Sequence, residues 1–320
     1  MHIPESFLSP STCAVLGVSM IPVWRNAAIK VKKELSKKKL PMLGICSAFS
    51  FLIMMFNLPL PGGTTGHAVG AVLAAILLGP HAAAISITVA IVIQAIFFGD
   101  GGILAIGANS FNLAFVMPYA GFYVYSFTKN KMKSSKGEYL AAFIAGYIGV
   151  SLAALTTAIE FGIQPLLFKD AAGLPLYCPY PLQVAIPAMV IPHLLVVGII
   201  EGAVTAGIYG YIKRVSPEAL YKSEKVYFKP VYMLLISLVA LSPIGLVASG
   251  TAWGEWAKEE IQTLVGYIPK GMEKGFSFTS LMPDYTLAHT PEVLAYVFSA
   301  VIGVTIILLL FRWMKKMSRS

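Results

Sequence analysis

The chain of 320 residues is 57% hydrophobic and only 12% charged, whereas roughly a quarter of the residues in a soluble domain are charged. This composition excludes a soluble globular protein and predicts an all-α polytopic membrane protein that is embedded in the lipid bilayer. The formal net charge of +9 follows from the membrane topology described below and indicates no nucleic-acid partner.

Apolar stretches long enough to cross a membrane recur along the whole chain. A spanning helix needs about 20 residues with few charges, and suitable stretches occur at 10–28, 41–58, 109–127, 139–161, 184–212, 231–248 and 293–313. The stretch 68–98 is longer and is interrupted by Gly79-Pro80, which favours two short helices folded against each other. The sequence therefore predicts nine crossings.

The basic residues are concentrated in short loops, which set the orientation of the chain. Loops 25–39, 129–138, 213–229 and 312–320 hold 20 of the 24 Lys and Arg residues, and such an excess marks cytoplasmic loops. The amino terminus is therefore predicted outside the membrane and the carboxyl terminus inside it. No secretory signal precedes Met1, so we expect Met1 to be retained.

The polar linker 213–229 separates two predicted units. Residues 1–212, the N-terminal domain, are predicted to form a seven-helix bundle, and residues 230–320, the C-terminal module, a pair of helices. The segment 249–292 between those two helices is predicted to be extracytoplasmic. Its Trp253-Gly254-Glu255-Trp256 run, followed by charged residues, suggests a short amphipathic helix at the interface, structured but without a catalytic role.

Two of the five histidines are predicted at the same membrane depth: His2 at the outer amino terminus and His67 at the end of the outer loop 59–66. The α-amine of Met1, the amide nitrogen of His2 and the Nδ1 atom of His2 can chelate one metal ion through fused rings. Square-planar nitrogen coordination is typical of Ni(II) or Cu(II), and the His67 imidazole would complete the square. Pro4 stiffens the terminus, which reduces the entropy lost on ordering it.

Other polar residues near this predicted site have two interpretations. Gln94, Asp100 and Asn109 flank the outer loop, and a metal-bound imidazole normally donates its second N–H to an oxygen of such a group. Alternatively, Asn109 caps the helix that follows it. His81, just after the Gly79-Pro80 break, is expected in the cytoplasmic half of the membrane, too far away to join the site.

Several short motifs stand out along the chain: MHIPESFLSP at 1–10, GGTTGH at 62–67, FGDGG at 98–102, GAN at 107–109, PH at 192–193 and IEG at 200–202. These motifs resemble those of the CbiM/NikM family, the substrate-capture (S) components of energy-coupling-factor importers for nickel and cobalt. The resemblance covers about residues 1–212. The family opening usually has Asp-Gly where this chain has Glu5-Ser6, which restricts the turn.

The resemblance implies a seven-helix S component in the cytoplasmic membrane of a prokaryote, with Ni(II) or Co(II) as the transported substrate and no organic cofactor. It implies Met1, His2 and His67 as the metal ligands. It also implies a transmembrane coupling (T) subunit and cytoplasmic ATPase subunits as partners, and the chain has no GxxxxGK[ST] loop of its own. The C-terminal module, with LMPDY at 281–285, is similar to the small two-helix companion component, fused here to the S component.

The remaining polar and small residues favour structural roles. Glu201 and His193, eight residues apart on one face of a predicted helix, favour an interhelical hydrogen bond over a relay coupling metal occupancy to the cytoplasmic side. Glu160 and Gln164 are expected to be hydrated at an outer helix end, and Cys13, Cys46 and Cys178 to be unpaired. Small residues at steps of four favour helix packing over partner docking; they are Gly66, Gly70 and Ala74, and Gly198, Gly202, Ala206 and Gly210.

Two other function classes compete with metal capture. An intramembrane metalloenzyme would need a His-Glu-x-x-His pair to activate water, and the sequence has none, so no enzymatic activity is predicted. An autonomous secondary transporter or channel usually shows paired interrupted helices or polar residues across the midplane, whereas this site lies at one surface. The choice between nickel and cobalt, including a cobalt-selective subunit for cobalamin synthesis, is left open by the sequence.

Overall fold

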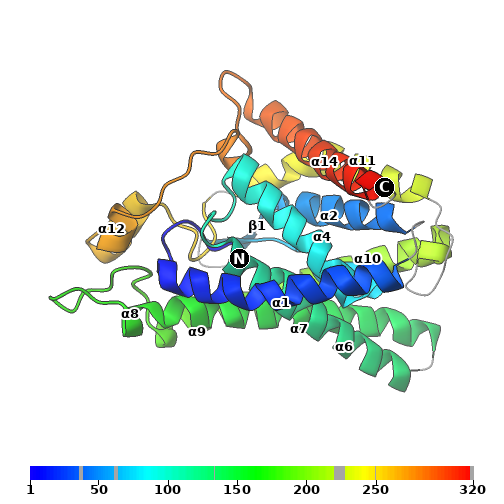
Figure 1. The fold of residues 1–320 in the computed structure, drawn as a ribbon, viewed down its shortest axis with the longest axis horizontal. Helices are drawn as coiled ribbons and strands as arrows, with labels where there is room; N and C mark the ends of the chain where they lie inside the picture. Colours follow the sequence, from blue (N-terminus) through cyan, green and yellow to red (C-terminus); the bar gives the residue numbers. More distant parts are fainter. Residues whose placement is uncertain (36–38, 61–63, 133, 220–227, 249, 318–320) are drawn as a thin grey trace.

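The computed structural model describes residues 1–35, 39–60, 64–132, 134–219, 228–248 and 250–317. Gly62 and Gly63 of the outer loop, and much of the linker 213–229, lie outside these described residues. The regular structure of the described chain is helical apart from one short β-hairpin and one isolated β-bridge, which agrees with the predicted all-α class (Figure 1).

The helices of the N-terminal domain fall on the predicted apolar stretches. They are α1 (Pro10–Glu34), α2 (Leu40–Met54), α3 (Ala71–Leu78), α4 (Pro80–Ile93), α5 (Ile106–Asn109), α6 (Met117–Lys131), α7 (Ser135–Gly162), α8 (Gln164–Leu167), α9 (Leu182–Pro192) and α10 (Gly198–Val215). π-helical segments extend or join them at Gln94–Phe98, Ser110–Val116 and His193–Val197. The hairpin consists of β1 (Leu58–Leu60) and β2 (Thr64–Gly66).

The C-terminal part contributes two long helices and a structured connection between them. Its helices are α11 (Phe228–Leu241), α12 (Lys258–Val265), α13 (Lys270–Glu273) and α14 (Glu292–Met317), with 3₁₀ turns at Ser242–Val247 and Pro283–Tyr285; another 3₁₀ turn, Pro217–Ala219, lies in the linker. The short helix α12 has an apolar side that buries Ile261. The helix begins at Lys258, in the charged residues that follow the Trp253–Trp256 run, and the run itself is not helical.

Six helical runs among the described residues are long and apolar enough to cross a membrane. The chain breaks at Gly79-Pro80 as predicted, and α3 packs against α4. However, α3 has eight residues, about 12 Å at 1.5 Å per residue, less than half of the roughly 30 Å hydrocarbon core. The count of nine crossings and the sides of the two termini therefore stay predictions.

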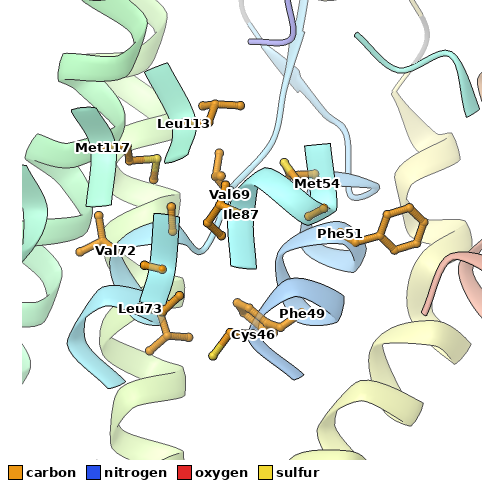
Figure 2. Packing of buried hydrophobic residues seen from close by; sticks show 14 of the residues in the cluster. Cys46, Phe49, Phe51, Met54, Val69, Val72, Leu73, Ile87, Leu113 and Met117 are labelled. Carbon is orange, nitrogen blue, oxygen red and sulfur yellow. The ribbon is translucent and has the colours of Figure 1, made fainter. Parts of the chain in front are cut away.

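The centre of the protein is built on α2, which is buried along almost its whole length from Met42 to Met54. Such a helix, apolar on every side, has to be enclosed by other helices. Helices α4, α11 and α14 pack around it, and Figure 2 shows its side chains Cys46 and Phe49 directed into the cluster that also contains Leu73 of α3. This packing joins the C-terminal module to the N-terminal domain.

The small residues of α10 lie against α7, which confirms the predicted helix packing. A Cβ atom added to Gly198, Gly202 or Gly210 would lie 2.9, 2.8 or 2.9 Å from Tyr147, Phe143 or Tyr139 of α7, respectively. The protein's own helix thus covers this stripe. The other predicted stripe is not helical throughout, because Gly66 ends strand β2 and Gly70 precedes α3.

The prediction that Glu160 and Gln164 are hydrated was wrong, whereas the prediction that the cysteines are unpaired was confirmed. Glu160 and Gln164 are buried, with 6% and 0% of their surface exposed, because the amino-terminal segment and the π-helical segment after α5 cover them. Gln164 accepts a hydrogen bond from the Ser9 amide, and Glu160 accepts one from Asn112. The three cysteines are free, as predicted, and all three are buried.

Gly70 is predicted to be sensitive to substitution. Its φ angle is 73°, a left-handed conformation that costs other residues roughly 1–2 kcal/mol, and an added Cβ would lie 2.5 Å from Cε1 of Phe49. We expect Gly70→Ala to lower the Tm of the purified protein in detergent. The control is Gly207→Ala in α10, where a Cβ meets nothing within 4 Å and alanine is the better helix former. Equal Tm values for the two variants would contradict this account.

Candidate metal centre

The amino terminus is fixed inside the protein by backbone pairing at Ile3. The Ile3 amide donates to Oδ1 of Asn109 at 2.8 Å, and the Ile3 carbonyl accepts from Nδ2 of Asn109 at 3.1 Å and from the Gly102 amide at 2.8 Å. Met1 and His2 are only 5% and 2% exposed. Asn109 lies inside a continuous helical run, so the helix-cap interpretation of this residue was wrong, and its side chain instead clamps the terminus.

The turn after Ile3 shows the consequence of Glu5-Ser6. Ser6 has a φ angle of 62°, in the left-handed region that glycine adopts without strain. The Glu5 carboxylate accepts hydrogen bonds from the Ile103 and Leu104 amides, and burial raises the pKa of Glu5, partly offset by these two hydrogen bonds. Glu5 therefore ties the terminus to the loop that also carries Asp100.

The β-hairpin positions His67 directly after strand β2. The strands are antiparallel with Leu58 opposite Gly66, and Nδ1 of His67 lies 3.1 Å from the Ala68 carbonyl oxygen. Because a carbonyl can only accept, Nδ1 carries the proton and Nε2 carries the lone pair. That Nε2 atom is buried and has no hydrogen-bond partner among the described residues.

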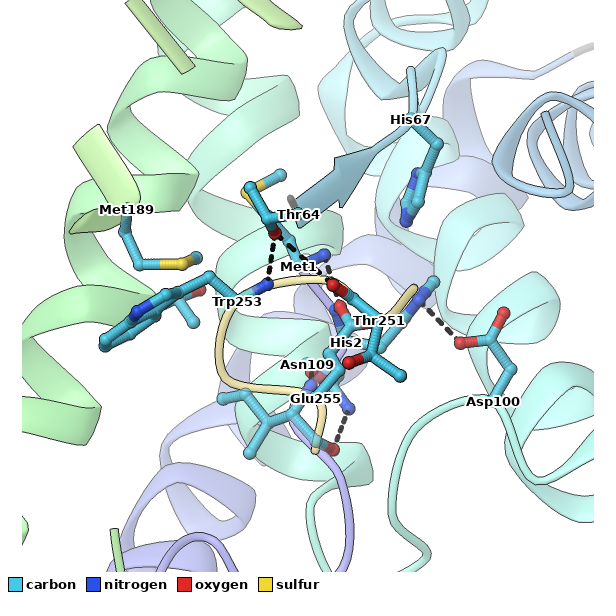
Figure 3. Close-up of polar contacts among 12 residues, drawn as sticks. Met1, His2, Thr64, His67, Asp100, Asn109, Met189, Thr251, Trp253 and Glu255 are labelled. Carbon is cyan, nitrogen blue, oxygen red and sulfur yellow. Dashed lines mark hydrogen bonds and ion pairs between the residues drawn. The ribbon is translucent and has the colours of Figure 1, made fainter. Parts of the chain in front are cut away.

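The two imidazoles predicted to share a metal lie next to each other. The ring centroids of His2 and His67 are 5.2 Å apart, with an angle of 23° between the ring planes, and Figure 3 shows the two rings pointing toward one another beside Met1. Nδ1 of His2 lies 2.8 Å from Oδ1 of Asp100. In this conformation, the predicted His2 donor atom is therefore paired with a carboxylate.

Asp100 in turn is held by residues from both parts of the chain. Its Oδ2 atom accepts hydrogen bonds from Nε2 of Gln94 at 3.1 Å and from the Tyr285 hydroxyl at 2.5 Å. Of the three predicted supporting residues, Asp100 thus contacts His2, Gln94 contacts Asp100, and Asn109 contacts the backbone of Ile3. His81 bonds to the Tyr119 hydroxyl of α6.

The α-amine of Met1 is paired with a residue that the sequence analysis did not assign to the site. Oε1 of Glu255 lies 2.6 Å from the Met1 amine and accepts the His2 amide at 2.8 Å. The adjacent Trp253 amide donates to the Thr64 hydroxyl of strand β2 at 2.7 Å. The only signal in the sequence was an isolated acid between two tryptophans in a segment predicted on the same side as Met1.

The charges at the site favour a neutral His67 and an ionised Asp100. Burial, together with the positive charges of the amino terminus and of His2, lowers the pKa of His67 well below its usual value. Burial disfavours the charged form of Asp100, but the charge of His2 and the hydrogen bonds from His2 and Tyr285 outweigh it and hold the pKa of Asp100 below its ordinary range. A neutral imidazole is the form that binds metal.

Both histidines line a cavity of about 330 Å³ that lies between the two parts of the chain. Its wall includes Asp100 from the N-terminal domain, and Glu255 and Asp284 from the segment 249–292. Among the described residues, no three His, Cys, Asp or Glu side chains are grouped to hold a metal ion.

Comparison with known proteins matches each part of the chain to a family. The CbiM family, described as the cobalt uptake substrate-specific transmembrane region, matches residues 2–219, and the PDGLE domain matches residues 229–320. The probable fused nickel transport protein LarMN of Lactiplantibacillus plantarum is 47% identical over 98% of this chain and 97% of its own length. The fused nickel transport protein NikMN of Rhodobacter capsulatus is 44% identical over 96% and 95%.

Solved structures give the same assignment for the N-terminal part. The crystal structure of a transition metal transporter superimposes with a TM-score of 0.64 at 55% sequence identity, and the match covers 68% of this chain and 95% of that one. These matches confirm the predicted family and the predicted fusion. The chain belongs to the CbiM family, with a PDGLE domain fused behind it, and is a multi-pass transport protein of the prokaryotic cell membrane.

Proposed function

We propose that the protein captures Ni(II) on the extracytoplasmic side of the membrane and passes it inward as the S component of an energy-coupling-factor importer. The proposed ligands are the Met1 amine, the His2 amide nitrogen, Nδ1 of His2 and Nε2 of His67. The observation that carries the proposal is the buried Nε2 atom of His67, unpartnered among the described residues, beside the ring of His2. A lone pair held in this way is suited to binding a metal ion.

Binding of the metal requires a local rearrangement at His2. Nδ1 of His2 now donates to Asp100, and the Met1 amine and His2 amide donate to Glu255. The metal would replace one proton on each of these nitrogens, and the three protons leave to solvent. The hydrogen bonds from the His2 amide and from Nδ1 of His2 are then lost, whereas the amine keeps two N–H groups that can still donate to Glu255. Rotation of the His2 ring turns Nδ1 from Asp100 toward the metal, and Nε2 can then donate to an oxygen, the usual arrangement for a metal-bound imidazole.

Nickel is the proposed substrate because of both the ligands and the relatives. Square-planar nitrogen coordination favours Ni(II) or Cu(II) over Co(II). Three relatives that this chain matches along nearly its whole length are named nickel transport proteins. By contrast, a cobalt transport protein CbiM from Geobacter sulfurreducens is 33% identical over 69% of this chain.

Energy for transport is proposed to come from separate ATPase subunits joined through a T subunit. The sequence contains no phosphate-binding GxxxxGK[ST] loop, and the resemblance to S components implies these partners. The basic loops would face them on the cytoplasmic side. At that end Glu138 pairs with Lys129 and Lys213, at 3.1 and 2.5 Å, and holds the end of α10 to the α6–α7 turn.

Removing either imidazole should break the site. We expect His67→Ala and His2→Ala each to weaken nickel binding by more than roughly 100-fold, since even residues that only support a ligand typically change metal affinity 10- to 100-fold. His67→Ala should also change the d–d absorption band of the nickel complex, because the fourth nitrogen is lost. The exposed His289 is the control, and His289→Ala should bind nickel as the unaltered protein does. Nickel binding that survives both site substitutions would refute the proposed ligand set.

The ligand set also predicts an order of affinities. Divalent metals bind nitrogen ligands more tightly in the order Co, Ni, Cu, and planar coordination strengthens the preference for nickel over cobalt. Competition titration of the purified full chain should therefore show cobalt displaced by nickel at equal concentration. Tighter binding of cobalt would point to a site of higher coordination number and would contradict the planar chelate.

Glu255 is expected to hold the amino terminus in place. Hydrogen bonds that involve a charged group contribute about 1.5–3 kcal/mol, so Glu255→Ala should accelerate hydrogen exchange of the amides of His2, Ile3 and Glu5 by roughly 10- to 100-fold. The matched control is Glu259→Ala, which removes an exposed acid from the first turn of α12. Mass spectrometry of the metal-free protein gives the rates, and equal rates in both variants would show that Glu255 does not anchor the terminus.

A further inference from the structure

Glu201 is a fully buried carboxylate, with 0% of its surface exposed, on helix α10. Its Oε2 atom accepts a hydrogen bond from the Val69 amide at 2.7 Å. Both oxygens accept from the Gly70 amide, at 3.0 and 3.3 Å. These amides belong to the residues two and three positions after His67.

The local backbone explains why a carboxylate is placed here. Val69 and Gly70 precede the first turn of α3, where amide groups have no helical acceptor. Gly70 is in the left-handed conformation, which directs the two successive amides to one side. A carboxylate offers two oxygens with four lone pairs and no donor, so it can accept both amides at once, which a hydroxyl or an amide side chain does less well.

The same short segment is held on its other side. The Ser50 hydroxyl of α2 donates to the Val69 carbonyl at 2.7 Å, and the Ala68 carbonyl accepts Nδ1 of His67. The peptide that follows His67 therefore has little freedom, and the direction of its Nε2 atom is set by this backbone. Of the polar groups around the segment, Glu201 forms the most hydrogen bonds to it.

We propose that Glu201 is a positioning residue for the metal site, holding the backbone of Val69 and Gly70 so that Nε2 of His67 reaches the fourth ligand position. This inference rests on the proposed function, because the position of His67 matters to the metal site only if His67 is a ligand. It refines the predicted structural hydrogen bond between helices, since Glu201 of α10 accepts the amides of Val69 and of Gly70, the N-cap residue of α3. His193, its predicted neighbour, bonds instead to the Met189 carbonyl within its own helical run.

Because α10 continues to Val215, His67 is tied to a helix whose far end carries Lys213 and Arg214. The site and the predicted cytoplasmic end are thus connected by one helix and one carboxylate.

The test compares Glu201→Gln and Glu201→Asp in the full chain, by nickel absorption spectrum and by nickel dissociation constant. Glutamine has the same size, but its NH₂ group cannot accept an amide. We therefore expect Glu201→Gln to shift the spectrum toward that of His67→Ala and to weaken binding by roughly 10-fold or more. Glu201→Asp keeps both oxygens with a shorter reach, and its spectrum should lie between those of the unaltered protein and Glu201→Gln.

A second measurement separates positioning of His67 from a general structural role. If Glu201 acts through His67, adding Glu201→Gln to His67→Ala should cause no further loss of affinity, as a double-mutant cycle measures. Glu160→Gln is the matched control, because Glu160 is another buried carboxylate and bonds to Asn112. It should leave the nickel spectrum unchanged.

Each outcome decides the proposal. A spectrum of Glu201→Gln identical to that of the unaltered protein overturns it, as does a full additional loss of affinity in the double variant. If Glu201→Gln does not fold, Glu201→Asp decides in its place: a shifted spectrum supports the proposal and an unshifted one overturns it. Failure of the proposed function is recognised separately, because then the unaltered protein and His67→Ala would give the same nickel spectrum.

Discussion

A buried α-amine needs a partner, and in this protein the partner comes from the opposite end of the chain. Glu255 accepts hydrogen bonds from both the Met1 amine and the His2 amide. The Asn109 side chain accepts a hydrogen bond from the Ile3 amide and donates one to the Ile3 carbonyl. Burying a charge is costly unless it is paired and hydrogen-bonded. These contacts therefore keep the first three residues inside the protein, next to His67, and the rest of the site depends on that placement.

The two fused parts of the chain contribute to one site. The N-terminal domain supplies both histidines and Asp100, whereas the segment 249–292 supplies Glu255 and Tyr285. Helices α11 and α14 pack on α2, and the segment between them contacts the amino terminus through Glu255; its helix α12 lies at one end of the molecule (Figure 1). The C-terminal module thus packs against the other helices and also lines the candidate metal centre, where its Glu255 accepts hydrogen bonds from the Met1 amine and the His2 amide.

The positions of the helices and the proximity of His2 to His67 could be predicted from the sequence, because both follow from short-range patterns and membrane topology. Apolar runs determine where helices form, and two outer segments at one depth can meet. The sequence did not reveal Glu255, since pairing across more than 250 residues depends on tertiary packing. For the same reason, Glu160 and Gln164 were wrongly predicted to be hydrated, although other segments of the chain bury them. Asn109 was considered as a helix cap, although its side chain binds the backbone of Ile3.

The central claim is that the amino terminus itself is a metal ligand, and X-ray absorption spectroscopy of the nickel-loaded full chain tests it most directly. The account predicts a four-coordinate, planar nickel ion with nitrogen ligands only, including scattering from two imidazole rings, because His2 and His67 both bind. A six-coordinate nickel ion with carboxylate or water oxygens would contradict it, since the ligands would then be side chains such as Asp100 and Glu255 rather than the terminal amine and amide.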